Sequence, residues 1–372
     1  MAAILVSVLL TAPSDAAPQR HVLYDGGSSY PRVIRLESGR VLASITTNDG
    51  AQGLGVIMAS EDDGRTFRQI ARIPDPAAAG SKGICCSVLF ELPSPVGALP
   101  KGTVLWAGTV GYLAMHGKQT KQRLWASKDR GTTWSFLSDI ASSPNQYNAW
   151  EPSMSVAADG RLVAFYSDET DKIKHDQKLV QVRSADGLQW TDYRETVVSD
   201  AWNVRPGMIN AIPLPGRGYF MTYEVCNNDK VHLCSAYFRR SADGWNYGDP
   251  RDLGTVVRTS DGKQGRHTPV PAWSPGPGPS GTILLITEML VHSGGALAAG
   301  NGGTILANDN GGDGPWYEIP APIKVSGVDN EGCRNFSPGL LPARDGRSVL
   351  EVTTDYDGPV CKTYYATGPL VR

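Results

Sequence analysis

The 372-residue sequence has no excess of charge of one sign and no long hydrophobic run. Its 35 Lys and Arg residues are balanced by 37 Asp and Glu residues, so the formal net charge is only -2. The sequence therefore lacks the basic stripe typical of nucleic acid binding and the polybasic run that binds an anionic membrane. The one apolar stretch at its N-terminus, of about ten residues, is too short to span a bilayer as a helix.

Metal-binding spacings and helical periodicity are also missing. No CxxC or HxxxH motif is present, so neither a catalytic transition metal nor a cofactor is expected, while a structural Ca²⁺ or Na⁺ ion stays open. The sequence instead has 42 glycines and 26 prolines distributed along its length. This distribution indicates many turns rather than one disordered tract.

The N-terminal apolar stretch is followed by small residues, in the order of a signal peptide core and its cleavage region. We predict that residues 1–17 are a signal peptide and that residues 18–372 form a single secreted domain. A buried N-terminal strand is the alternative reading of residues 1–17.

Six cysteines support an oxidising compartment. Two disulfides are expected from short spacing or from proximity to strand ends, although spacing alone does not establish pairing. The expected pairs are Cys226 with Cys234, and Cys333 with Cys361. The adjacent residues Cys85 and Cys86 leave two possibilities open, a vicinal disulfide or two buried thiols.

Internal repetition is the most informative feature of the sequence. A motif with the pattern Ser-x-Asp-x-Gly-x-Thr-aromatic occurs in two near copies and in three shortened or degenerate ones. The copies are ASEDDGRTF (59–67), ASKDRGTTW (126–134), RSADGLQW (183–190), RSADGWNY (240–247) and ANDNGGDGPW (307–316). In such a box the aspartate accepts hydrogen bonds from turn amides and the glycine supplies a positive φ, so its role is structural.

Alternating apolar strands with a similar opening precede each box. The openings are YPRV (30–33), CCSV (85–88), WEPS (150–153), RPGM (205–208), HTPV (267–270) and NFSP (335–338). They begin about sixty residues apart, which is the length of a four-stranded propeller blade. The sequence therefore predicts an all-β, six-bladed β-propeller, with two β-sandwiches as the alternative. Because the sixth unit is one strand short, residues 21–25 are expected to close the ring.

In a propeller, the starts of the first strands and the ends of the second strands gather on one face around the centre. Glu151 in WEP and Glu224 in TYE lie at such positions beside apolar or aromatic residues. Partial burial would raise the pKa of a carboxyl group toward that of a general acid, and two carboxyl groups in one site are the arrangement used for glycoside hydrolysis. Further candidate substrate contacts are Arg32, Asp49, Trp150, Arg205, Tyr223, His267, Arg334 and Tyr356. A turn is the more ordinary role of Asp49, and the core between blades is an equal alternative for Trp150 and Tyr223.

The repeated Asp boxes resemble those of the sialidase superfamily, and YPRVIRL, WEP and the later TYE resemble glycoside hydrolase family 93. That family consists of six-bladed exo-α-1,5-L-arabinanases, and the resemblance covers the whole chain after residue 17. It implies that Glu151 is the acid/base, that Glu224 is the nucleophile, and that the configuration is retained. For retention, the two carboxyl groups are expected to lie about 5–5.5 Å apart. The CC pair, NVRPGM and the cysteine-flanked segment after Glu224 depart from the family's pattern.

An exo-sialidase is the second candidate. Its chemistry needs arginines that clamp a carboxylate, a tyrosine nucleophile assisted by a glutamate, and an aspartic acid. The residues that could fill these roles are Arg32, Arg239 or Arg240, and Arg334 for the clamp, with Tyr356, Glu224 and Asp49 for the chemistry. It ranks second because YPRV departs from the sialidase Phe/Tyr-Arg-Ile-Pro, and because Glu151 would have no role.

A uronate-directed polysaccharide lyase, with His267 or His116 as the base, and a non-catalytic glycan-binding propeller are the remaining alternatives. The expected partner in every case is an oligosaccharide or polysaccharide, with no nucleic acid and no membrane, and the protein is expected to be a monomer.

Overall fold

The computed structural model describes residues 19–371 except 115–118, 231–232 and 277–279. The expected signal peptide at residues 1–17 and the alternative base His116 lie outside the described residues. Among the residues that are described, no helix is long and apolar enough to cross a membrane.

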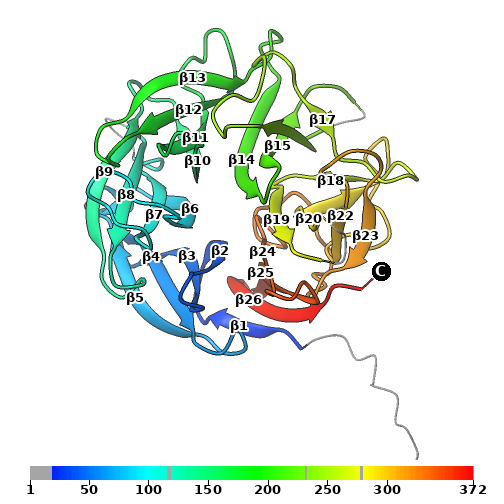
Figure 1. Ribbon diagram of the computed structural model, residues 1–372, viewed down its shortest axis with the longest axis horizontal. Coiled ribbons are helices and arrows are strands. Elements are labelled where there is room, and N and C mark those ends of the chain that lie inside the picture. The colour runs from blue at the N-terminus through cyan, green and yellow to red at the C-terminus, as the bar shows by residue number, and fades with distance from the viewer. Residues whose placement is uncertain (1–18, 115–118, 231–232, 277–279, 372) are drawn as a thin grey trace, which may run out of the picture.

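Six antiparallel sheets form a ring, with the first strand of each sheet nearest the centre (Figure 1). Blade 1 consists of β2(Ser29–Arg35), β3(Val41–Asp49), β4(Gln52–Ser60) and β5(Arg68–Pro74). Blade 2 consists of β6(Ile84–Glu91), β7(Val104–Val110), β8(Lys121–Ser127) and β9(Ser135–Ser142). Blade 3 consists of β10(Ala149–Val156), β11(Leu162–Asp168), β12(Lys178–Ser184) and β13(Thr191–Val197). Blade 4 consists of β14(Arg205–Leu214), β15(Gly218–Cys226), β16(Ser235–Ser241) and β17(Thr255–Val256). Blade 5 consists of β19(Val270–Ser274), β20(Thr282–Ile286), β22(Thr304–Asn308) and β23(Tyr317–Pro320). The predicted all-β six-bladed propeller is confirmed.

Blade 6 is assembled from both ends of the described chain. Its inner strands are β24(Gly339–Pro342), β25(Ser348–Asp357) and β26(Val360–Pro369), and its outer strand is β1(His21–Tyr24). β1 pairs antiparallel with β26, as was expected from the missing strand of the last repeat. Figure 1 shows β1 beside β26, so the ring is closed by hydrogen bonds between segments far apart in the sequence.

Two smaller additions complete the fold. The short strands β18(Gln264–Arg266) and β21(Met289–Val291) pair with each other and extend the sheet of blade 4. One 3₁₀ helix, η1(Pro76–Ala78), is the single helix among the described residues, and Asp75 caps it by accepting a hydrogen bond from the amide of Ala77.

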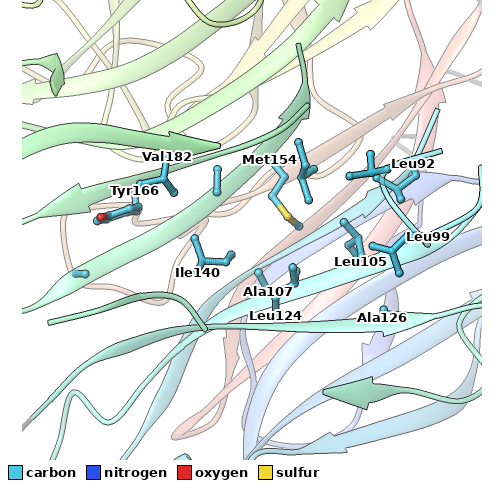
Figure 2. Close-up of a cluster of buried hydrophobic side chains, with 14 of the residues drawn as sticks. Leu92, Leu99, Leu105, Ala107, Leu124, Ala126, Ile140, Met154, Tyr166 and Val182 are labelled. Atoms are coloured by element: carbon cyan, nitrogen blue, oxygen red, sulfur yellow. The ribbon is translucent and has the colours of Figure 1, made fainter. Parts of the chain in front are cut away.

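The hydrophobic core is divided into clusters that lie between neighbouring blades. Because side chains alternate along a strand, each blade presents one apolar face to each neighbour. Figure 2 shows the cluster between blades 2 and 3, where Leu105 and Leu124 face Met154 and Tyr166. Equivalent clusters fill the other five interfaces, including the one between blades 6 and 1.

The Asp boxes close the turns between third and fourth strands. In the first box, Asp62 accepts hydrogen bonds from the Thr66 amide at 2.9 Å and from the Ser60 hydroxyl at 2.7 Å. Hydrogen bonds from Thr66 lower the pKa of Asp62 to about 2. The second box repeats this arrangement around Asp129, so the structural role expected for the boxes is confirmed.

All six cysteines form disulfides. The expected pairs Cys226–Cys234 and Cys333–Cys361 are both present. The pair whose state was open, Cys85 with Cys86, forms a vicinal disulfide at the start of β6.

The closing strand offers a matched test of the core between blades 6 and 1. Leu23 is 3% exposed in that core, whereas its neighbour Val22 is 46% exposed. Leu23→Ala should lower the free energy of unfolding by about 2–4 kcal/mol, because it removes buried methyl groups and leaves a cavity. Val22→Ala should change it by less than about 0.5 kcal/mol. Urea unfolding measures both, and equal effects of the two variants would show that β1 does not close the core.

Candidate active site

The first strand of every blade begins with the same unusual backbone feature. A residue other than glycine adopts a left-handed conformation there, with φ between 47° and 62°. These residues are Tyr30, Cys86, Glu151, Met208, Thr268 and Ser337. In blades 1 to 4, the strand pairing shifts register at this residue, which is a β-bulge. A bulge re-aims a side chain, so the six strand starts form a ring of residues around the centre.

Proline explains part of this local structure. Four of the six left-handed residues are followed by Pro31, Pro152, Pro269 or Pro338. Proline has no backbone N–H, so the interrupted strand pairing leaves no donor without a partner there. The position of Glu151 between Trp150 and Pro152 is therefore the blade 3 form of a feature that all six blades share.

The ends of the second strands form another set of equivalent positions. In blades 1 to 4, the residue just before the left-handed residue pairs across the sheet with a residue near the end of the second strand. These partners are Thr46, Thr109, Ser167 and Glu224. In blade 5, the Glu288 amide donates to the His267 carbonyl at 3.1 Å, and in blade 6, the Phe336 amide donates to the Thr354 hydroxyl at 3.2 Å. Four of these positions carry hydroxyl groups and two carry glutamates.

Glu151 is half-buried and bonded to the neighbouring strand. The Ser167 hydroxyl donates to Glu151 Oε2 at 2.6 Å and accepts from the Met208 amide at 3.2 Å. Burial, together with the negative charges of Glu224 and Glu169, raises the pKa of Glu151 to about 7 against the opposing hydrogen bond from Ser167. Glu151 is therefore a carboxylic acid at mildly acidic pH.

Glu224 lies in a different environment, where a backbone donor and a histidine approach one of its carboxyl oxygens. The Thr268 amide donates to Glu224 Oε2 at 2.9 Å, and His267 Nδ1 lies 3.3 Å from the same oxygen. The side chain is buried, and the Cys226–Cys234 disulfide contacts its other oxygen. A backbone donor aimed at a carboxylate stabilises the ionised form. The two predicted catalytic glutamates therefore lie in different environments, one bonded to a side-chain hydroxyl and the other to a backbone amide.

Four predicted contact residues lie near these carboxyl groups. His267 touches Glu224, and Trp150, the neighbour of Glu151, packs its ring 5.2 Å from that of Tyr112. Arg32 is buried over the Tyr30 ring and donates to the Ser337 hydroxyl at 2.9 Å. Arg205 binds Glu169 at 2.7 Å and Asp176 at 2.6 Å, so it belongs to an ion-pair network between blades 3 and 4.

Arg334 and Tyr356 form a separate pair on blade 6. The Arg334 guanidinium lies 5.2 Å from the Tyr356 ring and 3.1 Å from Glu331. Asp49 ends β3, where its exposed carboxylate pairs with Arg72 at 2.7 Å. The structure does not bring Asp49 into contact with either predicted catalytic glutamate.

Tyr223 requires a correction. Its side chain is 0% exposed in the core between blades 3 and 4, and its hydroxyl donates to the Leu253 carbonyl at 2.8 Å. The prediction that Tyr223 contacts substrate is therefore wrong. Tyr223 and Glu224 are adjacent in β15, so their side chains point to opposite faces of the blade.

The arginine clamp of a sialidase is not assembled. Arg239 donates to the Thr196 carbonyl at 3.0 Å, and Arg240 pairs with Asp313 at 2.6 Å, both from β16, the third strand of blade 4. These contacts hold both side chains away from the strand starts. Among the arginines named for the clamp, Arg32 and Arg334 remain on the side of Glu151 and Glu224.

Three residues among the strand starts were not included in the predicted substrate contacts. Tyr30, Cys86 and Met208 pack together at the centre, with Cys85, Trp150 and Phe336 against them. The x-Pro at four of the six blade openings could have identified Tyr30, whereas Cys86 and Met208 are not followed by proline.

One group of potential metal ligands is found within the described ranges, formed by Cys226, Cys234 and His267. Both sulfurs are held in a disulfide, whereas the metal-binding form of cysteine is the thiolate. The arrangement therefore does not fit a metal site.

Solved structures of glycoside hydrolases share this fold along the whole chain. An α-L-arabinanase from Penicillium chrysogenum complexed with arabinobiose is 26% identical, with a TM-score of 0.80 over 96% of this chain and 99% of that one. A family 93 α-L-arabinofuranosidase of Fusarium graminearum, also with arabinobiose, is 23% identical, with a TM-score of 0.78 over 94% of this chain and 97% of that one. A Hadza microbial sialidase shares the fold at 12% identity, with a TM-score of 0.61 over 92% of this chain and 66% of that one.

No protein-family model and no curated protein matches the sequence. The structural similarities nevertheless confirm the resemblance to glycoside hydrolase family 93 within the sialidase-like propellers, and the assignment as a glycoside hydrolase.

The raised pKa of Glu151 generates a prediction about stability. In the unfolded chain its carboxyl group titrates near 4.5, and in the folded protein at about 7. Between these values the folded state binds more protons, so the free energy of unfolding falls as pH rises. Glu151→Gln should show a smaller fall between pH 5 and pH 8 in urea unfolding. The exposed Glu61→Gln should parallel the wild type, and parallel curves for all three proteins would contradict the burial of Glu151.

Proposed function

We propose that this protein is a secreted exo-glycoside hydrolase that cleaves α-1,5-linked L-arabinan with retention of configuration. Glu151 is its acid/base and Glu224 its nucleophile. The observation that carries the proposal is the contrast between the two glutamates. The pKa of Glu151 is raised to about 7, chiefly by burial, so this carboxyl group holds its proton at mildly acidic pH. Glu224 instead accepts a hydrogen bond from a backbone amide at 2.9 Å, a contact that stabilises a carboxylate.

In the first step, Glu224 attacks the anomeric carbon while Glu151 gives its proton to the leaving glycosidic oxygen. The bond from the sugar to the leaving oxygen breaks, and an ester bond to Glu224 forms. A double displacement of this kind requires the two carboxyl groups to lie about 5–5.5 Å apart.

In the second step, Glu151 takes a proton from water, the resulting hydroxide attacks the anomeric carbon, and Glu224 leaves as a carboxylate. The change of role follows from electrostatics. The charge of Glu224 raises the pKa of Glu151, and the ester removes that charge. Glu151 is thus more acidic after glycosylation, when it must be a base, than before it, when it must hold a proton.

The substrate class is supported by the fold comparison. Both arabinose-active neighbours bind arabinobiose, and one of them matches this chain over 96% of its length. The exo mode and retention rest on the resemblance to family 93. Secretion is supported by the three disulfides, which persist in oxidising compartments.

The substrate and the exo mode can be tested together by product analysis. Linear α-1,5-arabinan should give one short product from the earliest time points, and sialyl-lactose should give no sialic acid. A ladder of products would show an endo enzyme. Release of sialic acid would favour the sialidase, and an unsaturated uronate product from a uronate polymer would favour the lyase.

The roles of the two glutamates can be separated by substitution. Glu224→Ala should stop turnover of every substrate. Glu151→Ala should lose about 10²–10⁴-fold in kcat. Partial recovery is expected on an aryl arabinoside, whose good leaving group needs no acid, and on addition of azide, which attacks the glycosyl-enzyme without a base. The surface variant Glu61→Gln serves as the control. Full activity of Glu151→Ala together with an inactive Tyr356→Phe would reject the proposal in favour of a sialidase mechanism.

A further inference from the structure

Ser167 joins the predicted acid/base to the backbone of the next blade. Its own backbone lies near the end of β11, where it pairs with Trp150 on one side and with Leu179 on the other. Its side chain is 0% exposed. The hydroxyl donates to Glu151 Oε2 at 2.6 Å and accepts from the Met208 amide at 3.2 Å. Two hydrogen bonds in series therefore connect Glu151 in blade 3 to the first strand of blade 4.

The direction of both hydrogen bonds is fixed by the groups involved. A backbone amide can only donate, so the oxygen of Ser167 must accept from Met208. A serine hydroxyl has one proton, and Ser167 makes no further hydrogen bond with the residues that the structure describes. Because an unpaired O–H is costly in a buried position, the proton of Ser167 points at Glu151 Oε2.

The Met208 amide is a rigid anchor for this arrangement. Met208 is the left-handed residue of blade 4, at the bulge of β14, and its sulfur accepts a hydrogen bond from the Tyr30 hydroxyl at 3.4 Å. Glu224 occupies the position of Ser167 in the following blade, and it likewise accepts from the left-handed residue beyond it, Thr268. A hydroxyl that makes this contact has a proton left to donate, whereas a carboxylate has none.

We propose that Ser167 is a positioning residue for the acid/base. It holds Glu151 Oε2 as a hydrogen-bond acceptor, so that Oε1 carries the proton that is delivered to the glycosidic oxygen. This inference rests on the proposed function. In the first step, the bond from Oε1 to its proton breaks as the proton joins the leaving oxygen, and Ser167 stabilises the carboxylate that forms. In the second step, Oε1 takes a proton from water while Ser167 stays bonded to Oε2.

The electrostatic surroundings of Glu151 are consistent with this role. The titratable and charged groups that act on its carboxyl group are Glu169, Glu224, Tyr30 and Arg32. Burial is the largest cause of its pKa of about 7, and the hydrogen bond from Ser167 opposes the rise, with a smaller effect of the Met208 amide in the same direction. Loss of the Ser167 hydroxyl should therefore make Glu151 a weaker acid.

A purely structural contact between blades is the competing explanation, and Ser153 provides a matched control for it. Ser153 lies in β10 of the same blade, is 3% exposed, and accepts from the Ala211 amide of blade 4 at 3.3 Å. Ser153→Ala thus removes a buried hydroxyl that accepts a blade 4 amide, as Ser167→Ala does, but it leaves the hydrogen bond to Glu151 in place.

The kinetic test compares kcat/KM on linear arabinan with kcat/KM on an aryl arabinoside with a good leaving group. Ser167→Ala should lose about 10–100-fold on arabinan, because a misplaced acid protonates the leaving oxygen poorly. On the aryl arabinoside, which needs no acid, the change should be less than about threefold. Ser153→Ala should change neither value by more than about threefold. Ser167→Thr keeps the hydroxyl and should recover most of the activity, since Thr46 and Thr109 occupy the equivalent positions of blades 1 and 2.

The pH profile separates positioning from a loss of stability. The alkaline limb of kcat/KM reports the ionisation of the acid in the free enzyme, which is expected at about pH 7 in the wild type. Ser167→Ala should move this limb upward by about one pH unit, because a hydrogen bond to a charged group changes a pKa by about that much. Ser153→Ala should leave the limb in place.

A carbon-13 NMR titration of the Glu151 carboxyl group, assigned with Glu151→Gln, measures the same shift without any substrate. Thermal unfolding identifies a variant that fails to fold. If Ser167→Ala is such a variant, Ser167→Cys takes its place, since a thiol is a weaker donor than a hydroxyl.

Two results would overturn the inference. Equal losses of Ser167→Ala on both substrates would show a general structural effect. An unchanged alkaline limb together with an unchanged carboxyl titration would show that Ser167 does not stabilise the ionised form of Glu151. Inactivity of the wild type on both substrates would instead reject the proposed function, and the positioning role with it, even if Ser167→Ala shifts the carboxyl titration.

Discussion

Each blade of this propeller depends on both neighbours for its hydrophobic core, so the ring has to close before its first and last blades are fully packed. Six clusters between blades supply that core, and none lies within a single sheet. Closure is achieved by β1, which comes from the N-terminal end and pairs with β26. Because packed interiors resist deformation, closure also fixes the six strand starts around one centre.

The site is built from a backbone feature that all six blades repeat. A left-handed residue costs roughly 1–2 kcal/mol when it is not glycine. Glycine would remove that cost, yet the six positions carry Tyr, Cys, Glu, Met, Thr and Ser. Strain of this kind persists where the side chain is needed. In blade 3 the side chain is Glu151, and the bulge lets both Trp150 and Glu151 face the site, which the alternation of a regular strand would forbid.

The fold was largely predictable because its signals are local and repeated. The Asp boxes, the blade openings, the missing strand and two cysteine pairs each follow from short stretches of sequence. Glu151 and Glu224 could be selected because they lie at such openings and strand ends. The error at Tyr223 came from treating strand ends as positions without a side-chain direction. Adjacent residues in β15 face opposite sides, so a centre-facing Glu224 places Tyr223 in the core.

Glu288 shows where sequence reasoning stops. It follows an apolar strand, as Glu224 does, and nothing nearby in the sequence indicates that its carboxyl group is buried with a raised pKa. That property depends on the loop with Asp329 and Glu331, which lies much further along the chain. Burial and the charges of distant segments are properties of the folded ring, and no strand pattern encodes them.

The charge of Glu224 links the carboxyl groups of the site. Burial is the largest cause of the raised pKa values of Glu151, Glu288 and Tyr30, and the charge of Glu224 adds to the rise at each of them. In the proposed first step, Glu224 loses its charge to the ester while Glu151 gains one by losing its proton. The negative charge therefore moves between neighbouring blades and does not increase in number. In a buried site, where each additional charge is expensive, this constancy avoids the cost of a second negative charge during the step.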